Sequence, residues 1–362
     1  MTRIGILSPS MFSGDAVSND VIGMRDALSR RGHDVRIFAE GWTTTAQKVW
    51  PANTIDSYLS KPSDILIYHY SRGWAPGLGV LRSQKGRTVI KYHNVTPPEF
   101  FARYSADFAR MCQDGRDELS PIARGDCNLY LSDSAFNMRE LVAAGAPQSK
   151  SFVVPPFHHI DRLDSIERDE KVSQAYEDGV TNICMVGRVA PNKGHPALIA
   201  AFAAYHHDYN PDSRLLIVGK EETRLNNYSR LLREMVRRLD LQGHVVFTGG
   251  VSDQALKSYY LASRAFMITS EHEGFCVPLV EAMALRLPIV AYAIAAIPDT
   301  VDDVGLVWEE HNPYLLAESL HSIVSNKSIS QALSEKGWRR YQEHFTNQRI
   351  EAGFLSALGK LI

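Results

Sequence analysis

The sequence lacks several features that would assign it to other protein classes. It has no apolar run of the roughly 18 residues that a membrane-spanning helix needs, which predicts a protein that is soluble or at most peripheral to a membrane. No Asp-x-Asp pair occurs, so a common carboxylate pair for a divalent cation is missing, and no metal is expected. The four cysteines show neither metal-ligand nor disulfide-framework spacing, which indicates a reducing cytoplasm.

Neither sign of charge predominates in the sequence. The formal net charge is −2 at pH 7, with 22% charged and 44% hydrophobic residues, which is the composition of a soluble globular protein. This balance gives no reason to expect a nucleic-acid partner. Residues 1–155 are mildly basic, which permits contact with an anionic acceptor or with the inner face of a membrane. No internal repeat and no low-complexity tract occurs.

The pattern that is present alternates strands with helices in two halves. A length of 362 residues suits two domains of about 150 to 180 residues, each with its own core. The expected strands are 4–7, 35–38, 65–68, 88–92 and 129–131 in the first half, and 183–186, 215–218, 245–247, 266–269, 289–291 and 306–308 in the second. A polar segment, 161–179, leads from one half to the other. The alternation predicts an α/β fold with doubly wound parallel sheets.

The densest group of chemically useful residues lies in the segment 270–283. An apolar strand ends before it, and Pro278 suits the first turn of the next helix, so the intervening loop lies at a helix N-terminus, a favourable place for a diphosphate. Glu273 and Glu281 flank this loop. Carboxylates repel phosphate but accept hydrogen bonds from vicinal hydroxyls, so a ligand with phosphates and diols, such as a sugar nucleotide, fits the motif. The alternative is two solvated acids favoured by the helix dipole.

A second motif follows the expected strand 183–186. Gly187 and Gly194 bracket a turn that contains Arg188 and Lys193. An arginine fork binds two phosphate oxygens and a lysine adds a point charge, which together offset the charge of a leaving diphosphate. Solvated loop cations are the alternative for either residue alone. Two basic residues after one strand and two acids after a later strand form a more specific pairing.

Together the two motifs resemble the Gly-Arg…Lys-Gly and Glu-x7-Glu elements of retaining glycosyltransferases of family 4, which have the GT-B fold. The resemblance implies two Rossmann-like domains facing a cleft. Residues 1–160 would form the acceptor-side domain, 161–340 would bind the nucleotide sugar, and a C-terminal helix in 341–362 would return to the N-terminal domain. It also implies a hinge between the domains.

The same resemblance implies roles for individual residues. Glu281 would hold the ribose diol, Glu273 would contact the transferred sugar, and Arg188 and Lys193 would bind the diphosphate. Backbone groups of the intervening loop would contact phosphate and sugar, and its residues are Gly274, Phe275, Cys276 and Val277. The family usually has glycine where this chain has Cys276, so a side chain is expected near the sugar. The base is expected near Val251, after the strand 245–247.

Three candidates follow strands of the first half, because ligands of open α/β sheets bind beyond the carboxyl ends of the strands. Gly14 lies where the family often has a Gly-Gly turn near the phosphate. His93 follows the strand 88–92, where the resemblance implies a histidine beside the reactive carbon of the donor sugar; a structural histidine is the alternative. Asp133 or Ser134 is interpreted first as a helix N-cap and only second as part of a site.

Two apolar patterns have simpler interpretations. A helical stripe near the C-terminus is expected to be core, and it consists of Trp338, Tyr341, Phe345, Ile350, Phe354, Leu358 and Leu361. A second stripe is expected either to pack on the core or to face a lipid-linked acceptor, and it consists of Phe100, Phe101, Tyr104, Phe108 and Met111.

The implied reaction is the retaining, metal-independent transfer of a hexose from a UDP- or GDP-sugar to a saccharide or lipid-linked saccharide in surface polysaccharide synthesis. No residue stands out to attack the sugar from its far face, which favours front-side attack with the departing phosphate accepting the proton. No cofactor is expected besides the donor substrate. A GT-B epimerase and a catalytically silent nucleotide-binding scaffold are the alternatives. A phosphorylase would need a pyridoxal lysine, which the sequence does not identify.

Overall fold

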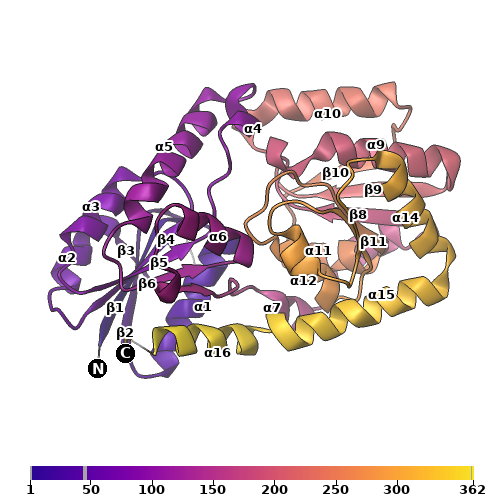
Figure 1. Ribbon diagram of the computed structural model, residues 1–362. Coiled ribbons are helices and arrows are strands. Elements are labelled where there is room, and N and C mark those ends of the chain that lie inside the picture. The colour runs from indigo at the N-terminus through magenta and orange to yellow at the C-terminus, as the bar shows by residue number, and fades with distance from the viewer. Residues whose placement is uncertain (1, 44–46, 360) are drawn as a thin grey trace. The chain divides into compact units, whose positions relative to one another are not determined.

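Parallel strands and helices alternate along the chain in the computed structural model, which describes residues 2–43, 47–359 and 361–362 (Figure 1). The strands form two separate sheets, of seven and six strands. The chain divides into a first unit, Met1–Glu99 with Asp107–His159 and Phe345–Ile362, and a second unit, Phe100–Ala106 with Ile160–His344. Two parallel α/β sheets are what the sequence predicts.

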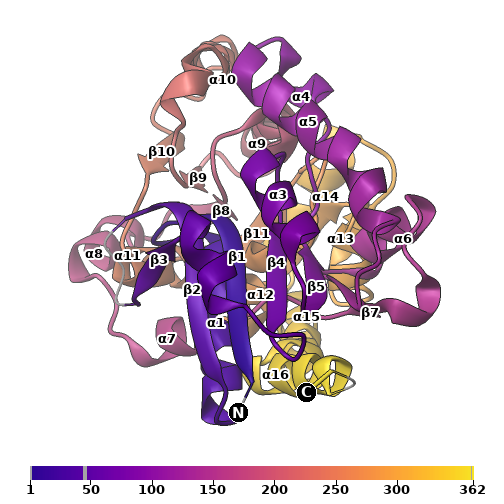
Figure 2. The same ribbon diagram turned by 90° about the vertical axis from the view of Figure 1, so that its left-hand side faces the viewer.

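The first sheet has the order β3-β2-β1-β4-β5-β6-β7, and all neighbouring strands are parallel. Its strands are β1 (Arg3–Met11), β2 (Asp34–Trp42), β3 (Val49–Pro51), β4 (Ile65–Tyr70), β5 (Arg87–Tyr92), β6 (Leu129–Ser132) and β7 (Ser151–Val153). In Figure 2 the strands β2, β1, β4 and β5 follow one another across the sheet. The α-helices in this part of the chain are α1 (Ala16–Arg30), α2 (Ile55–Tyr58), α3 (Ala75–Ser83), α4 (Glu99–Ala102), α5 (Ala106–Ala123) and α6 (Ala135–Ala143).

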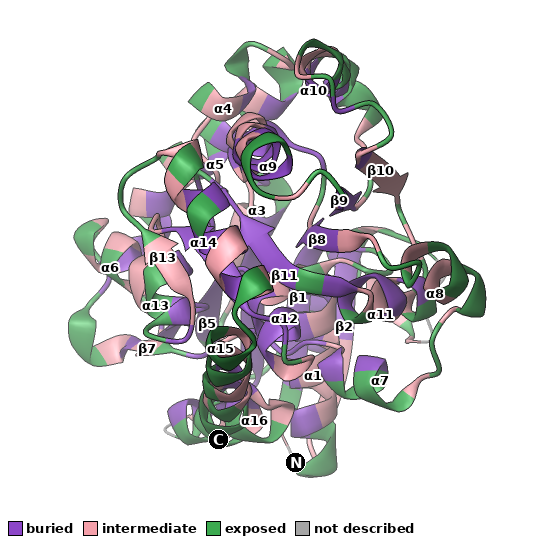
Figure 3. Cartoon of the chain, turned by 90° about the vertical axis from the view of Figure 1, so that its right-hand side faces the viewer, coloured by how far each residue is buried: buried purple, intermediate pink, exposed green. Residues whose placement is uncertain are grey.

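The second sheet has the order β10-β9-β8-β11-β12-β13, again parallel throughout. Its strands are β8 (Thr181–Val186), β9 (Ser213–Val218), β10 (Val245–Gly249), β11 (Ser263–Ile268), β12 (Ile289–Tyr292) and β13 (Leu306–Trp308). The helices are α7 (Ile160–Ser165), α8 (Glu170–Tyr176), α9 (His195–Asp208), α10 (Asn226–Arg238), α11 (Asp253–Leu261), α12 (Val277–Ala284), α13 (Ile297–Val301), α14 (Pro313–Ser325) and α15 (Lys327–Arg340). Figure 3 shows β8 and β11 largely buried and α15 largely exposed.

Local sequence signals explain where the first helix begins and ends. Asp15 caps α1 because its carboxylate accepts a hydrogen bond from the backbone N–H of Ser18 at 3.0 Å. The helix stops at Arg30, and Gly32 follows with a left-handed φ of +83°. Its apolar face, with Met24 and Leu28, lies in the core of the first unit.

The C-terminal helix α16 (Asn347–Leu358) also belongs to the first unit. Ile350, Phe354 and Leu358 recur every four residues, and all three are buried in the same core cluster as the face of α1. The ring of Phe354 packs edge-on against Phe157, with centroids 6.1 Å apart. The last helix of the chain therefore completes a core that begins at its first strand, as the sequence stripe predicts.

Some segments differ from the sequence interpretation. The polar segment 161–179 contains the short helices α7 and α8. The stripe that begins at Phe100 is divided between α4 and α5, and Phe101 and Phe108 are buried, which favours packing over a lipid-facing surface. The residues Phe100–Ala106 group with the second unit, whereas the sequence places them in the first domain. Among the described helices, none combines the length and hydropathy that crossing a membrane requires.

Candidate active site

Two loops at one edge of the second sheet carry most of the predicted site residues. The strand order reverses between β8 and β11, and in open α/β sheets such a switch point is where a ligand crevice is expected, beyond the carboxyl ends of the strands. Arg188 and Lys193 follow β8, and Glu273 follows β11. The sequence motifs therefore lie on the two sides of the point where an α/β sheet binds its ligand.

Backbone hydrogen bonds join these two loops. The carbonyl of Asn192 accepts from the N–H groups of Glu271 at 2.9 Å and His272 at 3.2 Å. The side-chain amide of Asn192 donates back to the carbonyl of His272 at 3.3 Å. The loop that carries Lys193 is thus held against the loop that carries Glu273.

Gly194 makes this close approach possible. Its φ is +64°, and a Cβ atom at this position would lie 1.9 Å from the carbonyl oxygen of Thr269. The Thr269 hydroxyl donates to the carbonyl of Gly194 at 2.9 Å. Any side chain at position 194 would push the two loops apart, so the glycine of the motif is a packing requirement.

Glu273 is buried and paired. Its Oε1 lies 2.6 Å from the Lys193 ammonium and accepts from the Ser270 hydroxyl at 2.7 Å. The residue is 7% exposed. A solvated acid at a helix start would face water, so the simpler alternative for Glu273 does not describe the structure.

Glu281 lies inside α12 and is 3% exposed. The phenol of Tyr260 donates to its Oε2 at 2.6 Å. Burial and the charge of Glu281 raise the pKa of Tyr260 well above its ordinary value, so the phenol remains a donor. Each carboxylate oxygen has two lone pairs, so a carboxylate can accept more than one hydrogen bond.

The position of Cys276 explains why the resembling family usually has glycine there. Cys276 precedes α12 with φ +74° and ψ +71°, a left-handed conformation that costs a non-glycine residue roughly 1 kcal/mol or more. Pro278 lies in the first turn of α12, as predicted. Burial, and next the charge of Glu273, raise the pKa of the Cys276 thiol well above its ordinary value, so this side chain adds no charge to the loop.

Arg188 and Val251 are more open. The Arg188 side chain is 56% exposed, and its guanidinium lies 3.9 Å from Glu222. Val251 follows β10 and is half-buried. The structure thus brings Lys193 and Glu273 into direct contact and leaves Arg188 available to a ligand, while the donor roles of all these residues stay predictions.

Gly274, Phe275 and Val277 lie between Glu273 and Glu281 in the second unit, and Phe275 is buried. The remaining candidates belong to the first unit. Gly14 follows β1 with φ +76°, and a Cβ atom there would meet open space. Ser134 caps α6 by accepting from the N–H of Asn137 at 3.1 Å, whereas Asp133 does not act as the cap. Instead, Asp133 Oδ2 lies 2.8 Å from Nδ1 of His93.

The His93 ring lies inside the first unit. Its Nε2 is 2.8 Å from Nδ1 of His69, so both ring nitrogens have protein partners. Sequence reasoning missed the residues around it, which are Asp20, His69 and Lys91. A usable signal was present, because Lys91 is a charged residue within an apolar strand and is fully buried.

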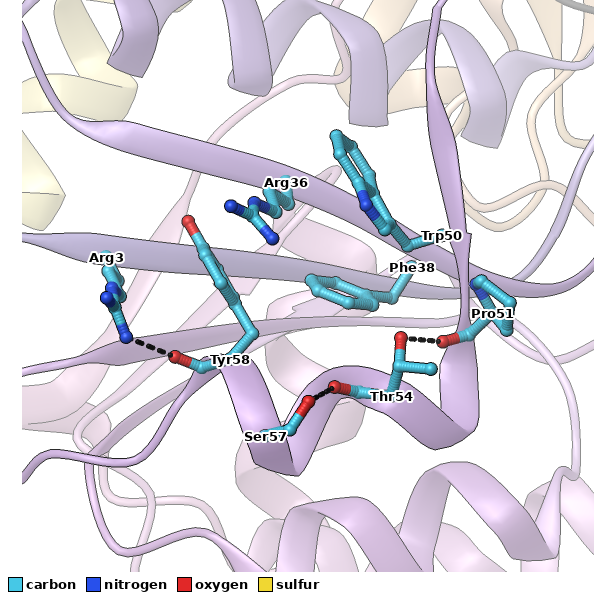
Figure 4. A pocket seen from close by; sticks show the side chains of 8 residues that line it. All are labelled: Arg3, Arg36, Phe38, Trp50, Pro51, Thr54, Ser57 and Tyr58. Carbon is cyan, nitrogen blue, oxygen red and sulfur yellow. Dashed lines mark hydrogen bonds between the residues drawn. The ribbon is translucent and has the colours of Figure 1, made fainter.

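One concavity lies away from all of these residues. It has a volume of about 370 Å³ and is lined by residues that include Arg3, Arg36, Trp50 and Tyr58 (Figure 4). The Arg36 guanidinium lies over the Tyr58 ring, 4.4 Å from its centroid. None of the predicted site residues lines this concavity.

His195, the first residue of α9, is buried next to the Lys193 loop. Burial, and next the charge of Lys193, lower the pKa of its imidazole from 6.5 to about 3. Its Nδ1 lies 3.3 Å from the Tyr228 hydroxyl. The folded protein therefore holds His195 neutral over a range in which the unfolded chain protonates it.

Acidification below about pH 6.5 is expected to destabilise the protein partly through His195. His195 of the unfolded chain binds a proton below about pH 6.5, whereas His195 of the folded protein binds it only below about pH 3. Between these two pH values, acidification lowers the free energy of unfolding through this residue by up to about 1.4 kcal/mol per pH unit, and above pH 6.5 it has no such effect. Urea unfolding near pH 7 and near pH 5 measures the slope. His195→Asn should flatten it, whereas His207→Asn, at an exposed position of the same helix, should not. An unchanged slope in His195→Asn would contradict this assignment.

Comparison with known proteins finds a family match for most of the second unit. Residues 166–340 match the family described as "Glycosyl transferases group 1". The chain is 27% identical over 192 residues to the capsular polysaccharide biosynthesis glycosyltransferase CapM of Staphylococcus aureus. The aligned segment covers 52% of this chain and 48% of CapM. It is 28% identical over 154 residues to the O-antigen chain mannosyltransferase B of Escherichia coli. The aligned segment covers 42% of this chain and 37% of that protein.

The whole fold is also found among solved structures. The Anabaena protein Alr3699/HepE, in complex with UDP and glucose, matches with a TM-score of 0.79 and 17% identity, over 99% of this chain and 100% of that one. WaaG, a glycosyltransferase involved in lipopolysaccharide biosynthesis, matches with a TM-score of 0.74 and 15% identity, over 98% and 100% of the two chains. At these identities the likeness shows the fold.

The likeness to these solved structures confirms the predicted GT-B fold, and the matched segment resembles bacterial glycosyltransferases. More particularly, the segment that matches the group 1 glycosyltransferases, residues 166–340, carries Arg188, Lys193, Glu273 and Glu281. The chain spans about half the length of CapM and less of the mannosyltransferase. Membership of family 4 and retention of configuration stay predictions.

Proposed function

We propose that the protein transfers a hexose from a UDP- or GDP-sugar to a saccharide or lipid-linked saccharide acceptor during assembly of a surface polysaccharide, with retention and without a metal. The observation that carries this proposal is the ion pair between Lys193 and Glu273, 2.6 Å apart in the crevice of the second sheet. It places a cation suited to phosphate beside a carboxylate suited to sugar hydroxyls. Relatives named for capsular polysaccharide and O-antigen mannose transfer support the hexose and the polysaccharide.

Donor binding would exchange this ion pair for contacts with the ligand. The Lys193 ammonium would turn to the diphosphate, and the Glu273 carboxylate would accept hydrogen bonds from the sugar. Before the donor arrives, the two charges neutralise each other, so neither Lys193 nor Glu273 is buried as an unpaired charge. Arg188 would supply the second cation, and the first N–H groups of α12 would face the phosphate.

The chemistry requires no nucleophile from the protein. The bond between the anomeric carbon and the phosphate oxygen breaks, and the acceptor oxygen bonds to the same face of that carbon. The acceptor's proton passes to the departing phosphate. Arg188, Lys193 and the helix N-terminus stabilise the charge that develops on the diphosphate, while Glu273 faces the oxocarbenium-like sugar. Gly14 and His93 keep the donor-side roles that the resemblance implies, as predictions.

A thermal-shift panel with UDP, GDP, ADP and their sugar conjugates tests this function. One base is expected to stabilise the protein, by roughly 2.7 kcal/mol at about a hundred times its dissociation constant. The shift should be the same with EDTA, because phosphate charge is met by Arg188, Lys193 and backbone groups. Proton NMR of the product made with the stabilising donor then reports the anomeric configuration.

Each other outcome would select a different function. No shift with any nucleotide would indicate a catalytically silent scaffold. Interconversion of the sugar conjugate without an acceptor would indicate an epimerase. A shift that disappears with EDTA would contradict metal independence, and an inverted product would contradict retention.

A further inference from the structure

Five ionisable side chains meet in the interior of the first unit. They come from α1 (Asp20), β4 (His69), β5 (Lys91) and the segments after β5 and β6 (His93 and Asp133). Their exposed fractions are 0% for Asp20, His69 and Lys91, 5% for His93 and 6% for Asp133. Burying this many charged groups is costly unless they pair, so their arrangement needs a physical explanation.

Asp133 and His69 hold the two edges of the His93 ring. Asp133 Oδ2 lies 2.8 Å from Nδ1 of His93, and His69 Nδ1 lies 2.8 Å from its Nε2. The other oxygen of Asp133 lies 2.6 Å from the Lys91 ammonium. Lys91 also donates to the carbonyl of Val154. The His93 ring is therefore fixed on both sides.

Asp20 is arranged differently. Its Oδ1 accepts from the N–H of Phe157 at 2.8 Å. Its Oδ2 lies 3.7 Å from Lys91 Nζ, 3.7 Å from His93 Nε2 and 3.8 Å from His69 Nδ1, and it has no hydrogen bond within the described residues. A fully buried carboxylate oxygen without a hydrogen bond is much less costly when it carries a proton.

The charges of the cluster lead to the same conclusion. Two ionised aspartates and one lysine sum to −1, so one additional proton makes the cluster neutral. Burial raises the pKa of Asp20 more than Lys91 and His93 lower it. Asp133 differs, because its Oδ1 lies 2.6 Å from the Lys91 ammonium and its Oδ2 lies 2.8 Å from His93 Nδ1, and both contacts favour its ionised form. Burial lowers the pKa of His69 well below its ordinary value, so His69 is neutral.

A metal ion is a poorer explanation of the same residues. Asp20, His69 and His93 have ligand atoms within 4.8 Å of one another. The two histidine nitrogens, however, are 2.8 Å apart, which is a hydrogen-bond length, while two nitrogens on a tetrahedral zinc lie about 3.3 Å apart. The Lys91 ammonium also lies 3.7 Å from Asp20, the acidic member of this group, and would repel a bound cation.

We infer that the two aspartates of this cluster have opposite protonation states, with Asp20 a neutral acid and Asp133 ionised, and that His69 and Asp133 are positioning residues for His93. His69 then donates from Nδ1 to Nε2 of His93, and His93 donates from Nδ1 to Asp133. Both imidazoles are neutral and carry their proton on Nδ1.

The next residue shows what this positioning fixes. Asn94 has a left-handed φ of +73°, and its side-chain amide donates to Asn137 Oδ1 at 2.8 Å. The His93 ring is buried, so the backbone is the larger exposed part of this residue. The cluster anchors the turn at the carboxyl end of β5. Its effect on turnover, unlike its protonation, rests on the proposed function.

The experiment compares Asp20→Asn with Asp133→Asn in the full-length protein. Asparagine resembles a neutral acid, so Asp20→Asn should keep kcat within about threefold, and Asp133→Asn should lower it about ten- to hundredfold, as loss of an orienting partner does. Asp64→Asn is the matched control, because Asp64 is buried in the same unit but bonds only the N–H groups of Ser60 and Lys61.

Stability against pH gives a readout that does not depend on turnover. The folded state binds the Asp20 proton more tightly than the unfolded chain does, so the parent should lose stability relative to Asp20→Asn as the pH rises above about 4. The pH dependence of stability has the opposite direction for Asp133. Asp133→Asn should be less stable than the parent at neutral pH, and this difference in stability should shrink below about pH 4.

Nitrogen-15 NMR of the histidine rings then decides between the protonation states. Both rings are expected as neutral Nδ1–H tautomers in the parent and in Asp20→Asn. A doubly protonated His93 in the parent, or equal losses of turnover in the two variants, would overturn the inference. Stoichiometric metal removed by a chelator with a change in these NMR signals would also overturn it. If the parent transfers no sugar, the proposed function fails, while the NMR and stability results still decide this inference.

Discussion

Arg188→Ala is expected to lower kcat/KM about a thousandfold, which corresponds to about 4 kcal/mol of lost transition-state stabilisation. The guanidinium is 56% exposed and lies 3.9 Å from Glu222, so little structure depends on it. Its expected role is to fork onto the departing diphosphate, where negative charge grows as the sugar bond breaks. The melting temperature should therefore remain close to that of the parent.

Two further variants sharpen this test. Arg188→Lys keeps the charge but loses the planar fork, so its activity should fall between that of the parent and that of Arg188→Ala. Arg168→Ala is the matched control, because Arg168 is similarly exposed and also pairs with a glutamate, Glu177, but outside the site loops. It should leave kcat/KM unchanged. If Arg188→Ala were nearly as active as the parent, Arg188 would not bind the phosphate, and the phosphate site would have to lie elsewhere.

Glu281→Gln is expected to weaken nucleotide binding about a hundredfold, while kcat at saturating donor changes by less than about threefold. Two hydrogen bonds from ribose hydroxyls to an ionised carboxylate contribute roughly 1.5 to 3 kcal/mol each, and glutamine replaces one acceptor oxygen by a donor. Glutamine keeps the shape of the side chain beside Tyr260, which limits the effect on folding. Isothermal titration with the nucleotide measures the affinity.

Glu273→Gln should show the reverse pattern. Nucleotide affinity should change less than about fivefold, and kcat should fall about a hundredfold or more, because Glu273 is proposed to face the sugar and not the ribose. Glu335→Gln, on the exposed helix α15, is the control. If Glu281→Gln bound the nucleotide as tightly as the parent, the division of roles between the two glutamates would be wrong.

Much of the fold was predictable because its signals are local. The apolar runs of the strands and the helix signals, such as the Asp15 cap and Pro278 in a first helical turn, each depend on a few neighbouring residues. The segments that were not anticipated, such as α7 and α8, are short and polar. Asp169 caps α8 locally, and the rest of the second unit also contacts this segment, for example through the Ser258 hydroxyl, which accepts from the N–H of Asp169 at 2.8 Å.

The site was predictable to the extent that its residues are close in sequence. The spacing of Glu273 and Glu281 and the Arg188–Lys193 turn identified the two motifs and their chemistry. The sequence did not show that Glu273 pairs with Lys193 across 80 positions. It indicated that Cys276 is unusual at its place, but the reason, a left-handed backbone conformation, appears only in the structure.

The sequence by itself determined the fold class, the succession of strands and helices, and the Gly-Arg…Lys-Gly and Glu-x7-Glu motifs, because hydrophobic period and turn chemistry act over a few residues. Tertiary structure alone decided that both glutamates are buried and that Asp20, His69, Lys91, His93 and Asp133 meet. Those five residues come from separate elements, and the order of strands in the sheet brings them together. Burial then fixes their charges, because the energy of an ionised group depends on its surroundings in space.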